Sequence, residues 1–180
     1  DVASALNTDR ESGKVISGHS VVEFSDTPVA LLNAGISDGR IYTHAYILRK
    51  IEKKHDIDLN GIVSLVDAIS EPAALLRDNA KDGYIVLTKQ HAKDINGRNA
   101  PVMVYLRPDG KGNFIASAYS KTENGERQFT NLINAGGLLS VDKNKIADLN
   151  LTGEVKSSFE SAKVGNLFSS VPQSSGTAQG

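Results

Sequence analysis

Residues 101–121 read PVMVYLRPDGKGNFIASAYSK, and this stretch decides the fold. Two β-rich runs, 101–107 and 113–121, flank a turn-forming segment from Pro108 to Gly112. Because Asp and Gly favour the tight turns that join antiparallel strands, the pattern predicts a β-hairpin. A further β-rich run at 84–89 precedes it, so we expect a small antiparallel sheet.

Helical patterns lie on both sides of this sheet in the sequence. Helices are expected from Pro28 to Gly35, from about Ile41 to Lys54, from an Asp58 cap to Glu71, around Phe129–Ile133 and from an Asp142 cap to Leu149, with a short strand at Leu138–Val141. The assignments rest on apolar spacing and on capping residues. They predict an α+β fold in which the N-terminal helices pack on one face of the sheet.

The ends of the chain differ in composition from the middle. Residues 1–20 and 164–180 are rich in small and polar residues and show little periodicity. Such segments bury too little apolar area to offset the entropy cost of ordering. We therefore expect a single domain at 21–163, a loose segment at 1–20 and a flexible tail at 164–180. Because the first residue is Asp1, we also expect a piece of a longer protein.

The overall composition excludes several classes of function. The net charge of -1 means that any nucleic-acid binding must come from a local basic patch. The 180 residues include no cysteine, which rules out disulfides and thiolate zinc sites. No apolar run approaches the roughly 20 residues of a membrane span, so no membrane contact is expected.

Two histidines, His44 and His55, belong to the predicted helix that begins near Ile41. On a helix they would point about 20° apart and lie about 16 Å apart along the axis. That spacing is too long for both to touch one atom, but they could flank a long substrate, or one alone could be catalytic. The plainer interpretation is that each is a hydrogen-bonded, partly buried residue.

The run at 113–121 is a second candidate for a site. Ser117, Tyr119 and Lys121 alternate with Phe114, Ala116 and Ala118. Since strand side chains alternate between faces, the apolar set would pack on the helices. The hydroxyl, phenol and ammonium would form a row able to position a phosphate. A solvated sheet face is the plainer interpretation. Thr88, at the end of an earlier strand, is a candidate of the same kind.

Other chemistries have less support. The four histidines lack HExxH-type spacing, and there is no G-x-S-x-G elbow, Walker loop or paired carboxylates. No metal site and no cofactor are therefore expected.

The order of elements and short motifs resembles the C-terminal domain of phage MuF-type head proteins and related polymorphic toxins. Those domains belong to the barnase–EndoU–colicin–RelE (BECR) class of nucleases. The resemblance covers roughly residues 38–150. It rests on the motif His44…Ile47-Leu48…Ile51…Lys54-His55, on Glu71-Pro72, and on the strands Tyr84–Thr88, Pro101–Val104 and Ile115–Lys121.

The resemblance implies a metal-independent ribonuclease that serves as a toxin or phage effector in the bacterial cytoplasm. Such enzymes let the 2′-hydroxyl attack the adjacent phosphate, which leaves a 2′,3′-cyclic phosphate. The implied catalytic residues are His44, His55, Ser117, Tyr119 and Lys121, and the implied RNA-binding residues are Thr88, Lys50, Lys54 and Arg107. RNA is the expected substrate, and a cognate immunity protein or antitoxin is a possible partner.

Within that implied site, a histidine suits a general acid or base because its pKa is near neutrality. Tyr119 could stack on a base or bond a phosphate, Lys121 could neutralise phosphate charge, and Ser117 could orient it. Two alternatives stay open. A non-catalytic binding module would have buried, satisfied histidines. An ADP-ribosyltransferase-like enzyme would need a late glutamate in the site, and Glu123 and Glu126 lie in a predicted turn.

Overall fold

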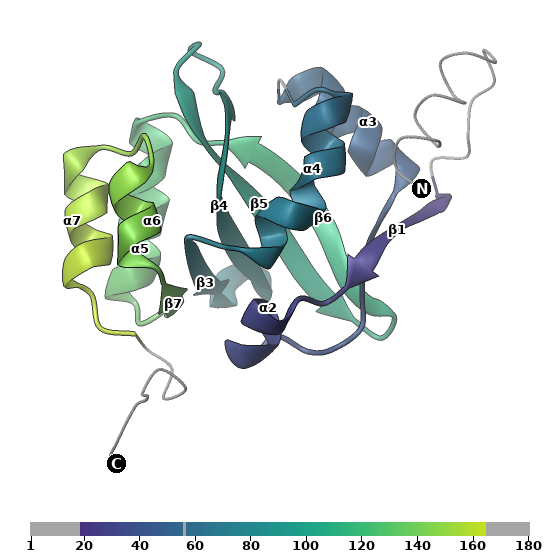
Figure 1. Ribbon diagram of the computed structural model, residues 1–180, viewed down its shortest axis with the longest axis horizontal. Helices are drawn as coiled ribbons and strands as arrows, with labels where there is room; N and C mark the ends of the chain where they lie inside the picture. Colours follow the sequence, from purple (N-terminus) through teal and green to yellow (C-terminus); the bar gives the residue numbers. More distant parts are fainter. Residues whose placement is uncertain (1–18, 56, 165–180) are drawn as a thin grey trace.

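The computed structural model describes residues 19–55 and 57–164 and places seven strands in one sheet with helices on both faces (Figure 1). The predicted loose ends lie outside the described residues, apart from His19, Ser20 and Val164. The α+β class is confirmed. No helix in the described ranges is long and apolar enough to cross a membrane.

The sheet has the strand order β1-β2-β6-β5-β4-β3-β7. Neighbouring strands are antiparallel except β2 and β6, which are parallel, so the expectation of a purely antiparallel sheet is corrected at this pair. The strands are β1 (Val21–Asp26), β2 (Arg40–His44), β3 (Ala74–Asp78), β4 (Gly83–Lys93), β5 (Asn99–Asp109), β6 (Gly112–Ser120) and β7 (Leu138–Val141). The helices are α2 (Val29–Asn33), α3 (Ala45–Lys54), α4 (Leu59–Ser70), α5 (Arg127–Asn134), α6 (Lys143–Asp148) and α7 (Gly153–Ser161), with 3-10 turns η1 (Asn79–Lys81) and η2 (Asn124–Glu126).

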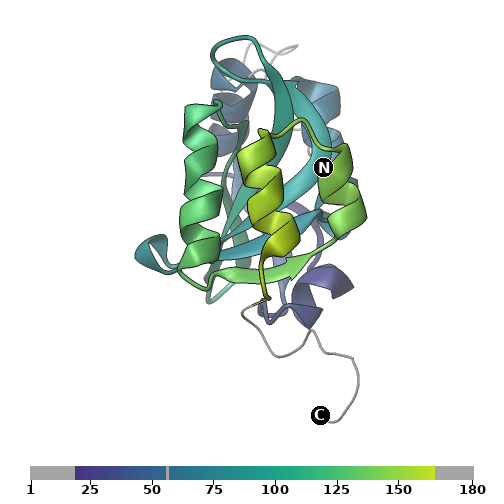
Figure 2. The ribbon, with the colours of Figure 1, turned by 90° about the vertical axis from the view of Figure 1, so that its left-hand side faces the viewer.

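Two hydrophobic cores lie on opposite faces of the sheet. Helices α2, α3 and α4 pack on one face, as predicted for the N-terminal helices, and α5, α6 and α7 pack on the other (Figures 1 and 2). Strand β5 joins both cores, because Val102 and Val104 enter the first while Met103 and Tyr105 enter the second. A strand buried on both faces reads as a continuous apolar run, and residues 101–106 do so.

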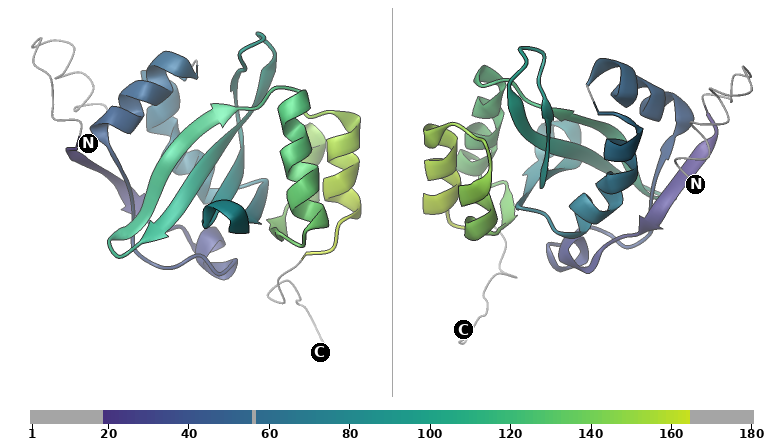
Figure 3. Two further views of the ribbon diagram at one scale, coloured as in Figure 1. Left: turned by 180° about the vertical axis from the view of Figure 1, so that it is seen from behind. Right: turned by 45° about the horizontal axis from the view of Figure 1, so that its top comes forward.

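The second face is only partly covered. Helices α5, α6 and α7 gather over its β3–β7 end, and the left panel of Figure 3 shows no α-helix of the described chain crossing β5 and β6 between α3 and α5. Directly opposed residues in paired strands share a face, so the registers of β5, β6 and β2 assign the side chains there. We call this region the open face; it carries Tyr42, His44, Tyr105, Arg107, Phe114, Ser117 and Tyr119.

Predicted caps mark the starts of α4 and α6. Asp58 Oδ1 accepts a hydrogen bond from the Gly61 N–H at 2.8 Å. Asp142 Oδ1 accepts one from the Lys145 N–H at 3.1 Å. Each cap satisfies an N–H group that has no partner within its own helix. These two predictions are confirmed, as are the short helices α2 and α5 and the strand β7.

The predicted helix from Ile41 begins too early. Residues 40–44 form β2, and helix α3 starts at Ala45. Ile41 and Thr43 are buried on the first face while Tyr42 and His44 lie on the open face, which is the period of two of a strand. β2 pairs with β1, a strand that the sequence analysis does not predict. His44 therefore precedes the helix instead of lying on its apolar face.

A bulge in β6 corrects the predicted division of its faces. Tyr105 pairs with Ser117, but Leu106 pairs with Ile115, so Ala116 is an extra residue. The extra residue reverses the alternation, which brings Phe114 to the same face as Ser117 and Tyr119. Ile115 and Ala118 instead point into the first core. Of the three residues expected to pack on the helices, Ala118 is fully buried in the first core, whereas Phe114 and Ala116 are partly buried at the margins of the first and the second core.

Two glycines permit the close parallel pairing of β2 and β6. Gly39 and Gly112 have φ values of +132° and +141°, a region that favours glycine. A Cβ on Gly39 would lie 2.9 Å from the Gly112 Cα, and one on Gly112 would collide with the carbonyl oxygen of Arg40. This close approach lies at the start of β2 and sets its register against β6.

Candidate functional site

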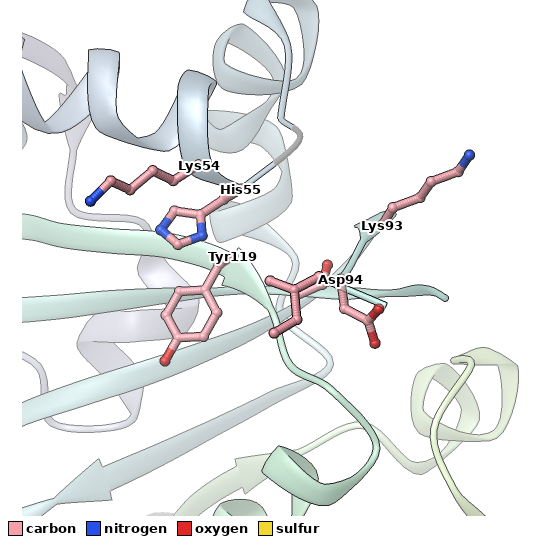
Figure 4. A pocket seen from close by; sticks show the side chains of 7 residues that line it. Lys54, His55, Lys93, Asp94 and Tyr119 are labelled. Atoms are coloured by element: carbon pink, nitrogen blue, oxygen red, sulfur yellow. The ribbon is translucent and has the colours of Figure 1, made fainter. Parts of the chain in front are cut away.

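The end of helix α3 lies against the last residues of β6. β2 pairs with β6 only as far as Phe114. At the next residue, the Thr43 hydroxyl donates to the Ile115 carbonyl at 2.7 Å. Beyond that point the edge of β6 faces α3. His55 is the C-cap residue of α3. Its imidazole therefore lies 5.1 Å from the Tyr119 ring, centroid to centroid, with 31° between the planes (Figure 4).

A small pocket surrounds this ring pair. It lies between the C-terminus of α3, the end of β6 and the turn that joins β4 to β5. Ile95, 84% exposed, stands at the tip of that turn. In Figure 4 the His55 ring points toward Tyr119, whereas Lys93 extends away from it. The lining residues are Lys54, His55, Lys93, Asp94, Ile95, Tyr119 and Ser120.

The surroundings of His55 favour its neutral form. Burial lowers the pKa of the imidazole, and the positive charges of Lys50 and Lys54 lower it further. Both effects disfavour the positively charged form of the imidazole. At neutral pH the ring therefore keeps a lone pair with which to accept a proton.

Lys121 lies on the other side of Tyr119. Its Nζ donates to the Tyr119 hydroxyl at 3.4 Å and lies 5.2 Å from the centre of the same ring. The pKa of Lys121 is lowered, first by burial and then by the charge of Lys81, while Asp78 acts in the opposite direction. Because the Tyr119 oxygen accepts from Lys121, the phenol proton is free to bond another acceptor.

Two more cations border the open face near Tyr105. The Lys81 Nζ lies 5.7 Å from the centre of the Tyr105 ring, and the charge of Arg107 acts on the Tyr105 hydroxyl. That hydroxyl donates to Asp78 Oδ2 at 2.8 Å, and burial followed by this bond raises the pKa of Tyr105. No carboxylate in the described ranges forms an ion pair with Lys81, Arg107 or Lys121.

His44 lies in a different place. It is separated from His55 by the ten residues of α3, a rise of about 15 Å. Its Nδ1 is 3.2 Å from the His19 carbonyl oxygen. Since a carbonyl only accepts, Nδ1 is the donor in this contact. Its ring contacts Phe114 and Tyr46 rather than Tyr119. The structure thus brings His55, but not His44, to Tyr119 and Lys121.

The other predicted site residues divide into two sets. Ser117 lies opposite Tyr105 on the open face, and Lys50 and Lys54 are near enough to act on the His55 pKa. Thr88 is fully buried and donates to the Val102 carbonyl at 2.7 Å. Its hydroxyl therefore offers no surface to a substrate, which corrects its assignment as a binding residue.

Sequence reasoning missed Lys81, Tyr105 and Phe114 as part of this surface. Tyr105 and Phe114 could have been found only by placing the β6 bulge, and Lys81 belongs to a turn with no recognisable spacing. Glu126 is 1% exposed and 2.5 Å from Arg98, so it is not available as the glutamate of a transferase site. Among residues 19–55 and 57–164, no three His, Asp or Glu side chains gather as metal ligands would.

Comparison with known protein families gives a match. A family model described as the phage MuF-C-terminal domain matches residues 47–148, more than half of the chain. The matched range starts in the first turn of α3 and ends with α6, so it includes His55, Tyr119 and Lys121 and leaves out His44. No curated protein and no solved structure matches the chain.

Proposed function

This chain belongs to the phage MuF C-terminal domain family, and on that premise we propose that it is a metal-independent ribonuclease with a BECR-like site around His55. The observation that carries the proposal is the row of His55, Tyr119 and Lys121 on one side of β6. In this row each side chain contacts the next. Its members are a neutral imidazole, a phenol whose proton is available for a hydrogen bond, and a partly buried ammonium. Acid–base cleavage of a phosphodiester requires groups of these kinds.

In the proposed reaction, the substrate phosphate lies over the Tyr119 hydroxyl. A ring nitrogen of His55 takes the proton of the 2′-hydroxyl, and the 2′-oxygen forms a bond to phosphorus. The bond from phosphorus to the 5′-oxygen breaks, and the leaving oxygen takes a proton from the Lys121 ammonium. The products are a 2′,3′-cyclic phosphate and a free 5′-hydroxyl. The Tyr119 phenol donates to a non-bridging oxygen as negative charge develops there.

The surrounding cations support an anionic polymer as substrate. Arg107 lies on the open face, Lys81 borders it, and Lys50 and Lys54 lie beside the pocket. This local group of positive charges attracts RNA even though the net charge of the whole chain is -1. A toxin or effector role, with a cognate immunity protein that covers these cations, forms part of the same proposal.

The direct test is cleavage of labelled single-stranded RNA by the purified chain in the presence of EDTA. We expect cleavage to persist in EDTA and to yield ends that carry a 2′,3′-cyclic phosphate. A control reaction with RNA methylated at every 2′-oxygen should give no product, because the attacking hydroxyl is absent. Intact unmodified RNA, or cleavage that EDTA abolishes, would contradict the proposal.

The pH dependence of cleavage follows from the two shifted pKa values. His55 acts when neutral, so kcat/KM should rise with pH through the pKa of His55, which burial and the nearby lysines place below its usual 6.5. Lys121 acts when charged, so kcat/KM should fall through its pKa, which lies below the usual 10.5. The profile should therefore be a bell with a plateau that includes pH 7, measured as kcat/KM against pH.

A matched variant tests the assignment of the acid limb. Lys54→Gln removes one of the charges that lower the pKa of His55, so the acid limb should move to higher pH while the alkaline limb stays in place. Lys143→Gln, on α6 and not among the residues that line the pocket, should leave both limbs unchanged. An acid limb that is the same in wild type and Lys54→Gln would speak against His55 as the base.

A further inference from the structure

The open face carries a second group of aromatic rings, at the end opposite to the His55 pocket. The His44 ring lies 5.2 Å from the Phe114 ring and 5.9 Å from the Tyr46 ring, with only 10° between the planes of the latter pair. Tyr42 lies 5.5 Å from Phe114 and its hydroxyl donates to the Asp109 carboxylate, which fixes its orientation. We call His44, Tyr46 and Phe114, with Tyr42 beneath them, the aromatic group.

Part of this group is open to solvent. Tyr46 is 44% exposed, and His44 and Phe114 are half-buried, whereas Tyr42 is 5% exposed and serves as their support. Aromatic rings that only fill a core are normally covered on both sides. Here the exposure of Tyr46 and the partial exposure of His44 and Phe114 leave part of the group uncovered by the described chain. Neighbouring apolar rings that remain exposed on a sheet commonly mark a binding surface.

The aromatic group and the His55 pocket share one strand as their floor. Phe114 and Tyr119 both lie on the open face of β6, and five residues of strand span about 16 Å. Between them, only the small side chains of Ala116 and Ser117 lie on this side of the strand, because Ile115 and Ala118 point into the first core. Arg107, opposite Phe114, lies beside one end, and Lys121 follows the other. The result is a strip of strand surface with rings at both ends and cations beside it.

We propose that the aromatic group is a base-binding subsite for the same single-stranded RNA that is cleaved at His55, several nucleotides away along β6. This inference rests on the proposed ribonuclease function and adds to it the form of the substrate. Aromatic side chains on a sheet bind unpaired bases by stacking, and neighbouring cations follow the phosphates. The bases of a duplex are stacked within the helix, so an RNA duplex does not fit this strip.

The test compares a long and a short substrate. We define the length preference as kcat/KM for a single-stranded octanucleotide divided by kcat/KM for a dinucleoside monophosphate, which cannot reach both ends of the strip. In Phe114→Ala and in Tyr46→Ala this preference should fall about tenfold, the usual size of one lost stacking contact. Val63→Ala, on helix α4 and similarly exposed at 45%, should keep the wild-type preference.

The outcomes separate this inference from the proposed function. An unchanged length preference in Tyr46→Ala, an exposed position whose replacement leaves both cores intact, overturns the subsite. If the wild type cleaves no RNA, the ribonuclease proposal fails, and affinity for a fluorescent single-stranded octadeoxynucleotide becomes the measurement. A roughly tenfold weaker affinity in Tyr46→Ala then supports the strip, and an equal affinity overturns it. Competition by an RNA duplex as strong as by the single strand also overturns it.

Discussion

Replacing His55 with alanine is expected to lower kcat/KM for RNA cleavage by about 10²–10⁴-fold, the usual contribution of a general base. The expectation follows from the position of the imidazole against Tyr119 and from its lowered pKa, which keeps it neutral at pH 7. RNA affinity should change little, because the cations that attract phosphate remain. The measurement is kcat/KM on a labelled octanucleotide, together with binding of a 2′-O-methyl analogue that cannot react.

His44→Ala is the matched control. It removes the same side chain from the other end of α3, and its expected effect is about tenfold and confined to long substrates. Added imidazole should restore part of the activity of His55→Ala, since a free base can occupy the vacated space, and should leave His44→Ala unchanged. Full activity in His55→Ala, or a larger loss in His44→Ala, would show that the base lies elsewhere.

Much of the fold was predictable from local patterns in the sequence. The turn from Pro108 to Gly112, the caps at Asp58 and Asp142 and the β-rich runs at 84–89 and 101–107 depend on neighbours close in the chain. Turns and caps of this kind can be recognised in a single sequence because their physical cause lies in residues close to one another in the chain. The α+β class followed from these elements alone.

The elements that were missed depend on distant partners. β1, β2 and β3 are short, and residues 74–76 are apolar in succession because β3 is buried on both faces. Short apolar runs of this kind do not distinguish a strand from a helix. The parallel pairing of β2 with β6 also needs Gly39 and Gly112 to meet across a large separation in sequence. Helix α7 was overlooked, although Thr152 caps it.

The candidate site was predictable only in part for the same reason. Tyr119 and Lys121 followed from strand alternation, and His55 from its place at the end of a helix. The separation of His44 from this group depended on where β2 ends, and Phe114 changed faces because of a one-residue bulge. A single extra residue in a strand reverses every side chain before it, and nothing in residues 113–121 marks Ala116 as that residue.

Replacing Glu126 with alanine is expected to lower the free energy of unfolding by about 3–5 kcal/mol, as for other buried ion pairs that lose one partner. Glu126 is 1% exposed, and its Oε2 lies 2.5 Å from an Arg98 guanidinium nitrogen. Its Oε1 accepts from the Thr152 N–H at 3.0 Å, and the same Arg98 nitrogen donates to the Asn150 carbonyl at 2.8 Å. One carboxylate thus joins η2, the β4–β5 turn and the segment before α7. The measurement is urea unfolding at neutral pH.

Two further variants make this expectation specific. Glu126→Gln keeps the shape and an acceptor for the Thr152 N–H but removes the charge, so it should cost less than alanine, about 1.5–3 kcal/mol. Glu123→Ala removes the other carboxylate near Arg98. The Glu123 side chain is 69% exposed and lies 3.9 Å from Arg98, so its loss should lower the free energy of unfolding by less than about 1 kcal/mol. Equal decreases in the free energy of unfolding for Glu123→Ala and Glu126→Ala would contradict the expectation that the buried ion pair stabilises the fold more than the exposed one. Because the β4–β5 turn also lines the His55 pocket, Glu126→Gln should lower cleavage as well as stability, whereas Glu123→Ala should lower neither appreciably.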